Sequence, residues 1–188
     1  ITEIRHEGKR KRVLIFGGGY DADKYENETV ESPTSLPTMG NALYVVDAKT
    51  GELIWSTSSS ISASNDTDKT AQTDVKYSVV AQPAVRDYDS DGLADMIYFA
   101  DLGGQIFRVD LNNLAHMNTT QKNITVRVQK IANLEETDFV PRFYDRVTTA
   151  VFGSGNERHV FVSVGSGNRS FPLKGSPVKN KVYGILDY

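Results

Sequence analysis

The sequence contains no cysteine among its 188 residues. Disulfide bonds, thiol catalysis and cysteine-ligated zinc are therefore excluded. It also lacks an uninterrupted run of about 18 apolar residues, the minimum for a membrane-spanning helix, so we expect no membrane span. Positive charge is not in excess either, because 21 Lys and Arg residues against 24 Asp and Glu residues give a net charge of −3. A mildly acidic chain does not favour nucleic acid as its main partner.

The remaining composition is that of a folded piece of a larger protein. Hydrophobic residues make up 39% and aromatic residues 10% of the chain, enough for a core and too many for a disordered segment. The chain begins with Ile1, and the segment Ile1–Arg12 is too polar for a signal peptide. We therefore expect an excised piece of a longer protein, of a size for one large domain or two small ones.

Short apolar segments rich in β-branched residues recur along the chain, and Gly, Asp and Asn separate them. Such spacing predicts antiparallel all-β structure, a sandwich or a propeller. Only Asn113–Met117 and Asn133–Thr137 indicate a helical turn. The expected strands are Val13–Phe16, Ala42–Val46, Glu52–Trp55, Tyr77–Val80, Pro83–Val85, Met96–Phe99, Gln105–Val109, Ile124–Ile131, Thr148–Phe152, His159–Val164 and Val182–Leu186.

A weak internal repeat favours the propeller. Gly40–Asp47 resembles Gly103–Asp110, with a glycine, an aromatic residue and a closing aspartate in register, and Val182–Asp187 repeats the ending. Recurring units of this kind are typical of stacked blades of antiparallel strands. At roughly 40–50 residues per blade the chain supplies about four blades at most, so we expect part of a propeller. We take residues 1–188 as a single domain with polar loop insertions near 21–39 and 57–74.

The segment Asp87–Asp95 carries the clearest chemical signal. Carboxylates stand at its first, third, fifth and ninth positions, and Gly92 at the sixth lets the backbone reverse. Alternate side chains of such a tight loop converge on a point, where Ca²⁺ takes six to eight oxygen ligands. Without a cation these carboxylates would repel one another. The predicted ligands of the Ca²⁺ ion are Asp87, Asp89, Asp91, the carbonyl oxygen of Leu93, and Asp95.

This loop departs from an EF-hand. The twelfth position, where a bidentate glutamate belongs, is Tyr98, and strands rather than helices flank the loop. We expect Asp95 to act as the closing ligand instead. Mg²⁺ fits less well, because a cage made only of protein ligands does not suit its octahedral, water-retaining coordination. A site between strands is expected to tie those strands together.

Several blocks, taken together and in order, resemble the C-terminal β-propeller of the PilC/PilY type IV pilus proteins. They cover most of the chain apart from the two polar loops. The turn that ends in Trp55 is also shared with many quinoprotein-like propellers. The blocks are Phe16–Asp21, Gly40–Trp55, Asp87–Asp95, Tyr98–Asp110, Val164–Leu173 and Val182–Asp187.

The resemblance implies a pilus-tip protein that promotes pilus assembly, opposes retraction and serves as an adhesin. In that family the matching aspartate loop binds calcium, and occupancy of the loop is linked to twitching motility. The implied partners are pilin subunits, other pilus-tip proteins, and host or abiotic surfaces. The implied location is exported, at the cell surface or the pilus tip.

Two other functions remain open at this stage. A quinoprotein dehydrogenase would share the turn Ala48–Trp55 and use a quinone with calcium, although no cluster of Arg, Lys and Asp is suited to hold a quinone. A purely structural propeller module would use calcium only to stabilise a blade. Other catalytic signals are lacking: the chain has no Gly-x-Ser-x-Gly nucleophile motif, and Gly153–Arg158 and Gly165–Ser170 lack the Gly-Lys-Ser/Thr of a phosphate loop. We expect no catalytic residues.

Four further features favour structural interpretations. Gly17–Gly19 is expected at a close backbone approach or a positive φ, and Trp55 is expected to pack between blades. Lys9–Arg12 is expected as a solvated segment that leads into the first strand. Asp21 and Asp23 are expected in a solvated loop rather than in a second cation site.

Overall fold

The computed structural model describes residues 1–26, 36–62, 68–113, 124–137, 139–153, 158–172 and 180–188. Within these ranges the structure is almost entirely β-strand, with one short helix, so the predicted all-β class is confirmed. The elements are β1 Thr2–His6, β2 Lys9–Gly17, α1 Ala22–Tyr25, β3 Ala42–Asp47, β4 Leu53–Ser58, β5 Lys69–Ala71, β6 Ala84–Arg86, β7 Met96–Ala100, β8 Gln105–Leu111, β9 Thr125–Asn133, β10 Thr148–Phe152, β11 His159–Gly165 and β12 Val182–Asp187.

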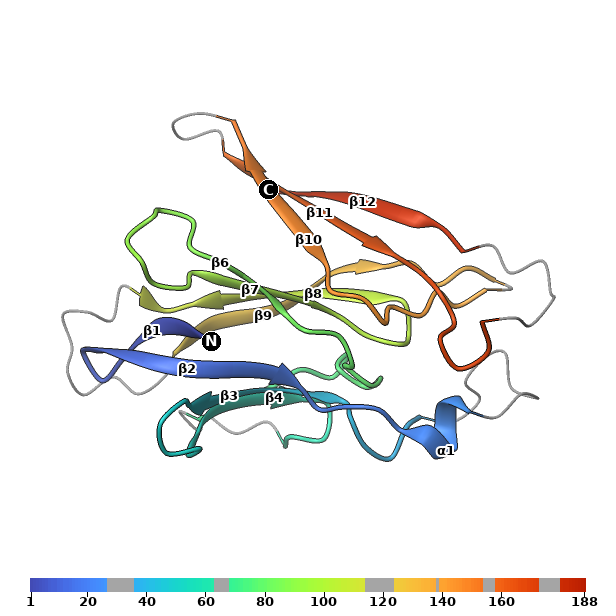
Figure 1. Cartoon of the computed structure of the whole chain (residues 1–188), viewed down its shortest axis with the longest axis horizontal. Helices are drawn as coiled ribbons and strands as arrows, with labels where there is room; N and C mark the ends of the chain where they lie inside the picture. The colour runs from blue at the N-terminus through green and yellow to red at the C-terminus, as the bar shows by residue number, and fades with distance from the viewer. Residues whose placement is uncertain (27–35, 63–67, 114–123, 138, 154–157, 173–179) are drawn as a thin grey trace.

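The strands form three sheets, and each sheet follows the order of the sequence. The first is β1-β2-β3-β4-β5, the second β6-β7-β8-β9 and the third β10-β11-β12. Every neighbouring pair is antiparallel except β4 and β5, which pair in parallel. The three sheets lie as three layers, with the second sheet in the middle (Figure 1).

Two hydrophobic clusters lie between these layers. One joins the first sheet to the second, and the other joins the second sheet to the third. Strand β7 of the middle sheet contributes side chains to both clusters, because successive side chains of a strand point to opposite faces of the sheet. Ile97 and Phe99 belong to the first cluster, and Tyr98 and Ala100 to the second. The unbroken apolar run of β7 in the sequence is thus explained by burial on both faces.

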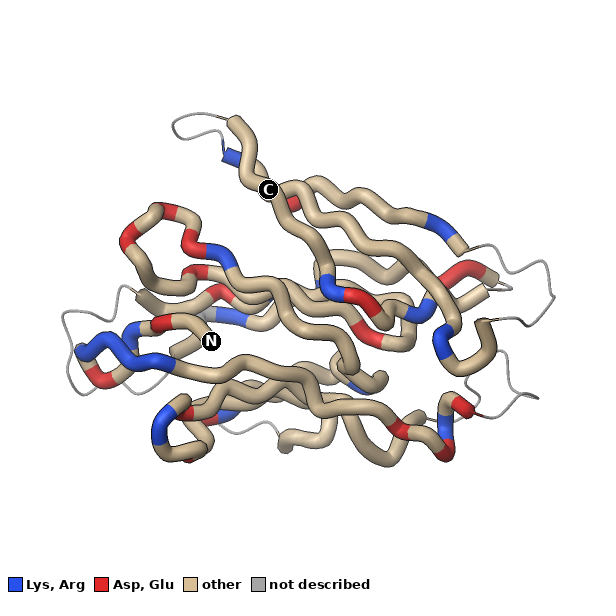
Figure 2. The backbone as a smooth tube through the Cα atoms, viewed as in Figure 1, with Lys and Arg blue, Asp and Glu red and all other residues tan. Residues whose placement is uncertain are grey.

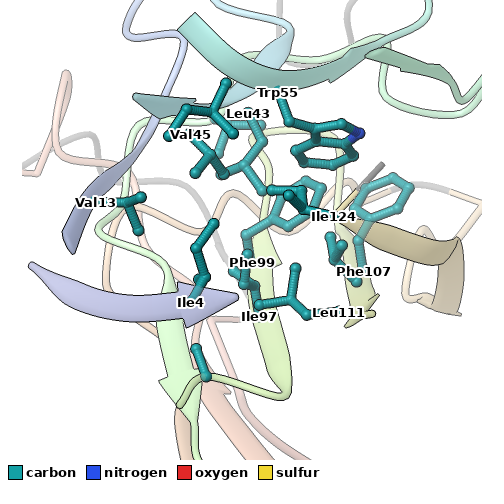
Figure 3. Close-up of a cluster of buried hydrophobic side chains, with 14 of the residues drawn as sticks. Ile4, Val13, Leu43, Val45, Trp55, Ile97, Phe99, Phe107, Leu111 and Ile124 are labelled. Carbon is teal, nitrogen blue, oxygen red and sulfur yellow. The ribbon is translucent and has the colours of Figure 1, made fainter. Parts of the chain in front are cut away.

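The first cluster centres on large aromatic and branched side chains that meet between the first two sheets (Figure 3). Trp55 is fully buried there, and its indole Nε1 donates a hydrogen bond to Thr70 Oγ1 at 3.1 Å. The rings of Phe99 and Phe107 stack beside it in the same cluster, with centroids 4.9 Å apart. Trp55 thus packs between the first two sheets, and its expected packing between propeller blades stays a prediction.

Three details of the strand prediction were wrong. Tyr77–Val80 is not a strand, and β6 begins only at Ala84. The apolar Val79 is the reason that the sequence predicted a strand here. Val79 does pack in the first hydrophobic cluster, but it does so from a segment without regular secondary structure. The polar β1 was missed, and Lys9–Arg12 lies within β2, paired to β1, rather than ahead of the first strand. The short β5 was missed as well.

The glycines at the end of β2 permit a close backbone approach. A Cβ on Gly17 would overlap the carbonyl oxygen of Val79, and one on Gly18 would lie 2.6 Å from the carbonyl oxygen of Gly40. Gly19 has φ +104°, which favours glycine. The close backbone approach or positive φ expected at Gly17–Gly19 is therefore confirmed.

Asp21 has a structural role that the sequence did not predict. It is 3% exposed and caps α1, with Oδ1 accepting from Lys24 N at 3.2 Å and Oδ2 accepting from Thr38 N at 2.7 Å. Although burial opposes ionisation, the hydrogen bonds from Thr38 and Lys24 lower the pKa of Asp21 below its ordinary value. Asp21 is thus a helix cap rather than part of a solvated loop.

A polar network connects the third sheet to the second. Asp187 Oδ2, on β12, accepts hydrogen bonds from Tyr98 Oη at 2.6 Å and from Arg108 Nη1 at 2.9 Å. Arg108 also pairs with Asp110 at 2.5 Å, and Asp110 pairs with Arg127. Burial and the adjacent Asp187 carboxylate raise the pKa of Tyr98, so its hydroxyl stays a donor.

Candidate metal site

The acidic loop connects β6 to β7 in the middle sheet. Residues 87–95 follow directly after Arg86, and β6 pairs with β7 through Arg86 and Met96. Ser90 and Gly92 have φ of 67° and 86°, the left-handed conformation that reverses the chain within a few residues. Gly92 thus adopts a conformation that suits the reversal expected from the sequence.

Three of the predicted ligands converge in this loop. Asp87, Asp89 and Asp95 each offer one carboxylate oxygen, and these atoms lie within 4.8 Å of one another. Two ligands of one Ca²⁺ ion can stand at most roughly 5 Å apart, since each lies about 2.3–2.6 Å from the ion. The spacing is therefore compatible with one shared cation.

The other two predicted ligands are adjacent but are not part of this group of three. Asp91 Oδ1 accepts a hydrogen bond from the amide of Leu93 at 2.7 Å, which closes a tight turn. The Leu93 side chain is 1% exposed and anchors the loop in the protein interior. The assignment of Asp91 and of the Leu93 carbonyl as ligands stays a prediction.

Main-chain amides hold the carboxylates in place. Asp87 accepts from the amides of Asp91 at 3.2 Å and Gly92 at 2.9 Å. Asp89 accepts from Asp91 N at 3.1 Å, and Asp95 accepts from Tyr88 N at 2.5 Å. Local hydrogen bonds of this kind are the reason that aspartate is common in tight turns. They leave further lone pairs of the same oxygens for a cation.

Residues distant in sequence support the loop, and no motif indicated their role. Asn113 Nδ2 donates to Asp95 Oδ1 at 2.6 Å and to the carbonyl of Ala94 at 2.9 Å. Arg10 Nη2 donates to the carbonyl of Asp91 at 2.6 Å. Arg10 belongs to the basic run at the start of β2, which lies on the same side of the molecule as the acidic loop (Figure 2).

The loop also contacts both outer sheets. The amide of Ala94 donates to the carbonyl of Glu3, on β1, at 2.8 Å. On the other side, Tyr88 and Arg158 bind each other twice: Tyr88 Oη donates to the Arg158 carbonyl at 3.1 Å, and Arg158 Nη1 donates to the Tyr88 carbonyl at 3.1 Å. The Arg158 guanidinium lies 5.8 Å from the centre of the Tyr88 ring. The loop is therefore held by the first sheet and by the segment that leads into β11.

The donor set suits a hard cation. It consists of carboxylate oxygens, and the loop contains no nitrogen or sulfur ligand of the kind that zinc prefers. Asp87 and Asp89 are exposed and Asp95 is half-buried, so an ion can reach them from solvent. The chemistry of the arrangement is therefore that of a candidate site for a hard divalent cation.

Two other sequence features have plain structural outcomes. Gly165–Ser170 follows β11 in the connection toward β12, as expected for a turn between strands. Most of Gly153–Arg158 lies outside the described residues. In the described ranges, no helix has the length and apolar character needed to cross a membrane.

Comparisons with known proteins give one match in sequence and one in structure. The chain is 33% identical over 103 residues to a type IV pilus biogenesis factor PilY1 homolog of Xylella fastidiosa, a match that covers 53% of this chain and 6% of that protein. Its fold resembles the crystal structure of the Pseudomonas aeruginosa PilY1 C-terminal domain, with a TM-score of 0.53 at 17% identity. That match covers 98% of this chain and 47% of the solved chain. No protein-family model matches the chain.

These two matches agree with each other. The sequence match is to a protein named for pilus biogenesis, and the structural match is to the C-terminal domain of a protein of the same name. The chain spans less than half of the solved domain and a small fraction of the curated relative. The resemblance to the PilC/PilY proteins that the sequence predicts is therefore confirmed, with the likeness of fold extending over almost the whole chain.

Proposed function

We propose that this chain is a calcium-binding, non-enzymatic segment of a type IV pilus-associated protein. Its role is to support pilus assembly, twitching motility and adhesion to surfaces. The observation that carries the proposal is the convergence of Asp87, Asp89 and Asp95 in one loop, within a chain that is similar to a PilY1 homolog. Asp91 and the Leu93 carbonyl complete the proposed ligand set.

Calcium would neutralise carboxylates that otherwise repel one another. The proposed ligands all stand in the connection between β6 and β7, so a bound ion would fix the ends of these two strands relative to each other. Because the loop also contacts Glu3 and Arg158, this order would extend to the outer sheets. The surface presented to a partner would thus depend on the ion.

We further propose that the three sheets are blades of a β-propeller. Support comes from the three sequence repeats: they coincide with β3, β8 and β12, and each of these is the third strand of its sheet. Sheets that place the same motif on the same strand are equivalent units, as blades are. Face-to-face packing through two apolar clusters is also typical of neighbouring blades.

The proposed partners follow from the pilus role. They are pilin subunits or other proteins of the pilus tip, together with host or abiotic surfaces. The proposed location is outside the cell, at the cell surface or pilus tip. Support comes from the similarity to the Xylella fastidiosa protein, which is named as a type IV pilus biogenesis factor.

The calcium site is tested by calorimetric titration of calcium into the wild-type chain and into Asp89→Asn. The asparagine keeps the shape of the side chain but removes one of the converging charges. We expect binding to weaken roughly tenfold or more, because ligand charge is a main determinant of calcium affinity.

Asp145→Asn is the matched control. Asp145 is exposed and pairs with Arg169 at 2.5 Å, away from the loop. Its substitution removes the same net charge, so calcium affinity should change little. Equal affinity in wild type and Asp89→Asn, or an equal loss in both variants, would remove the site assignment.

A further inference from the structure

The guanidinium of Arg10 lies against the acidic loop. Arg10, on β2, donates from Nη2 to the carbonyl oxygen of Asp91 at 2.6 Å. Its Nη1 lies 3.2 Å from the position that a Cβ on Gly92 would occupy, and 3.4 Å from Glu3 Oε2. The guanidinium thus lies against the turn Asp91–Gly92, whose amides hold the carboxylates of Asp87 and Asp89.

The charge of Arg10 lies against the backbone of the acidic turn, and its guanidinium also pairs with Glu3. Arginine is always protonated, so its positive charge offsets part of the repulsion within the loop. A divalent cation that enters the loop meets this same charge and is repelled by it. The side chain of Arg10 is 50% exposed, so the effect is moderate and is screened by salt.

We propose that Arg10 sets the cation affinity of the loop by supporting the ion-free state and opposing the bound divalent cation. This inference rests on the proposed calcium site. It makes Arg10 a positioning and charge-balancing residue rather than a ligand. The first sheet thereby influences the cation affinity of the loop, because the strand that carries Arg10 is paired with β1 and β3.

The contacts of neighbouring basic residues differ from those of Arg10, although Arg12 shares Glu3 with it. Arg12 extends to the other oxygen of Glu3, at 3.5 Å. Lys11 points to the opposite face of the strand and pairs with Asp47 at 3.0 Å. Arg158 contacts the loop at Tyr88, where its guanidinium covers the aromatic ring. Arg10 is therefore the residue of the basic run that we propose as the charged neighbour of the acidic turn.

The test is calcium titration of wild type, Arg10→Gln, Arg10→Lys and Arg12→Gln at low and high ionic strength. Glutamine keeps a hydrogen-bond donor for the Asp91 carbonyl but removes the charge. We expect Arg10→Gln to bind calcium about three- to tenfold more tightly at low salt. Lysine keeps the charge, so Arg10→Lys should stay close to wild type.

Salt separates this effect from a merely structural one. At about 1 M salt the Debye length is about 3 Å, so the gain in Arg10→Gln should largely disappear. Arg12→Gln removes a charge from the same strand and the same Glu3 partner, and it should change affinity much less. Equal gains in Arg10→Gln and Arg12→Gln would assign the effect to net charge and overturn the inference.

Thermal melts provide a second readout that does not depend on heats of binding. The coupling is reciprocal, so Arg10→Gln should melt lower than wild type in EDTA and close to wild type in saturating calcium. A variant that melts lower by the same amount in both conditions has lost only a structural contact, which contradicts the inference. Far-UV circular dichroism verifies that each variant is folded.

The failure of this inference is distinguishable from the failure of the site. If wild type binds calcium and Asp89→Asn does not, but Arg10→Gln is unchanged or weaker, only the role of Arg10 is wrong. If wild type shows no calcium binding, the site itself is wrong, and this inference falls with it.

Discussion

At the scale of single residues, Asp101 is an ionisable group held completely away from water. It is 0% exposed in the turn between β7 and β8. Its Oδ1 accepts from the amides of Gly103 at 2.9 Å and Gln105 at 3.0 Å, and its Oδ2 accepts from Gln105 Nε2 at 2.8 Å. Burial raises the pKa of Asp101 to about 7, although these hydrogen bonds and the charge of Lys130 act in the opposite direction.

This raised pKa predicts an unusual dependence of stability on pH. The folded state holds the Asp101 proton more tightly than the unfolded state, whose pKa is the ordinary 3.8. The stabilisation is therefore complete below about pH 4, is lost as the pH rises toward about 7, and is constant above that. We expect a loss of about 1.4 kcal/mol of unfolding free energy per pH unit from this group.

Chemical denaturation from pH 4 to pH 8 in EDTA measures this dependence, with Asp101→Asn as the comparison. Asparagine cannot titrate, so the difference in unfolding free energy between the two proteins should vary with pH across this range and level off above about pH 7. A difference that is the same at pH 4.5 and pH 7.5 would contradict the assignment to Asp101.

The acidic loop could be predicted from the sequence because its aspartates are close neighbours in the chain. The alternation of aspartates from Asp87 to Asp95 already places side chains on one side of a turn. The supporting residues could not be predicted, since Arg10 and Asn113 reach the loop only through the packing of other strands. Burial of Asp101 was also not predictable, because Asp-Leu-Gly-Gly reads as an exposed hairpin turn.

At the scale of elements, one polar link between the third sheet and the second has little contact with solvent. Asp187 of β12 reaches Tyr98 of β7 and Arg108 of β8, and the Arg108 and Asp187 side chains are 12% and 10% exposed. A charged pair with so little solvent contact is sensitive to loss of one partner. The link therefore matters more than an exposed ion pair would.

Asp187→Asn is expected to destabilise the fold by about 1–3 kcal/mol, because Tyr98 and Arg108 lose a charged acceptor in a nearly dry position. The loss should appear first as faster amide hydrogen exchange in β10–β12, with the first sheet little changed. Asp145→Asn, which breaks an ion pair exposed by 65% on each side, should cost only a few tenths of a kcal/mol. Equal effects of the two substitutions would contradict the role of Asp187.

The strands were predictable where apolar residues and turn residues agreed. β7 and β8 were placed within two residues of their observed ends, because the hairpin turn at 101–104 separates two apolar runs. β1 was missed, since its alternating charged residues belong to an outer strand with one buried side chain, Ile4. Tyr77–Val80 was misread because burial of a side chain does not by itself require a partner strand.

At the scale of the whole molecule, the acidic loop touches all three sheets. It belongs to the second, receives Arg10 and donates to Glu3 of the first, and binds Arg158 next to β11 of the third. An ion that orders the loop should therefore stabilise the molecule as a unit rather than one hairpin. The distinction between these two outcomes can be measured.

We expect calcium at about a hundred times its dissociation constant to stabilise the fold by about 2.7 kcal/mol. For a chain of this size that corresponds to a rise in Tm of roughly 5–10 °C. Calorimetry should show one transition that moves as a whole, and Asp89→Asn should show a much smaller shift. A second, unshifted transition would show that the loop acts only locally.

The same variant separates a regulatory role of calcium from a purely structural one. If Asp89→Asn in the intact protein lowers the thermal stability but leaves twitching motility unchanged, calcium only stabilises the fold. Lost motility with a normal amount of folded protein would support regulation.

Three-layer packing itself was not predictable in detail, because the sequence repeat marks equivalent strands but not which faces meet.

The order of strands in the sheets has a consequence for how the chain folds. Within each sheet, every hydrogen-bonded pair joins strands that are consecutive in sequence, and only β4 and β5 pair in parallel. Hairpins close quickly because little chain entropy is lost, whereas contacts distant in sequence form slowly. Each sheet can thus assemble from its own segment, and the slow step is the docking of finished sheets through the two apolar clusters.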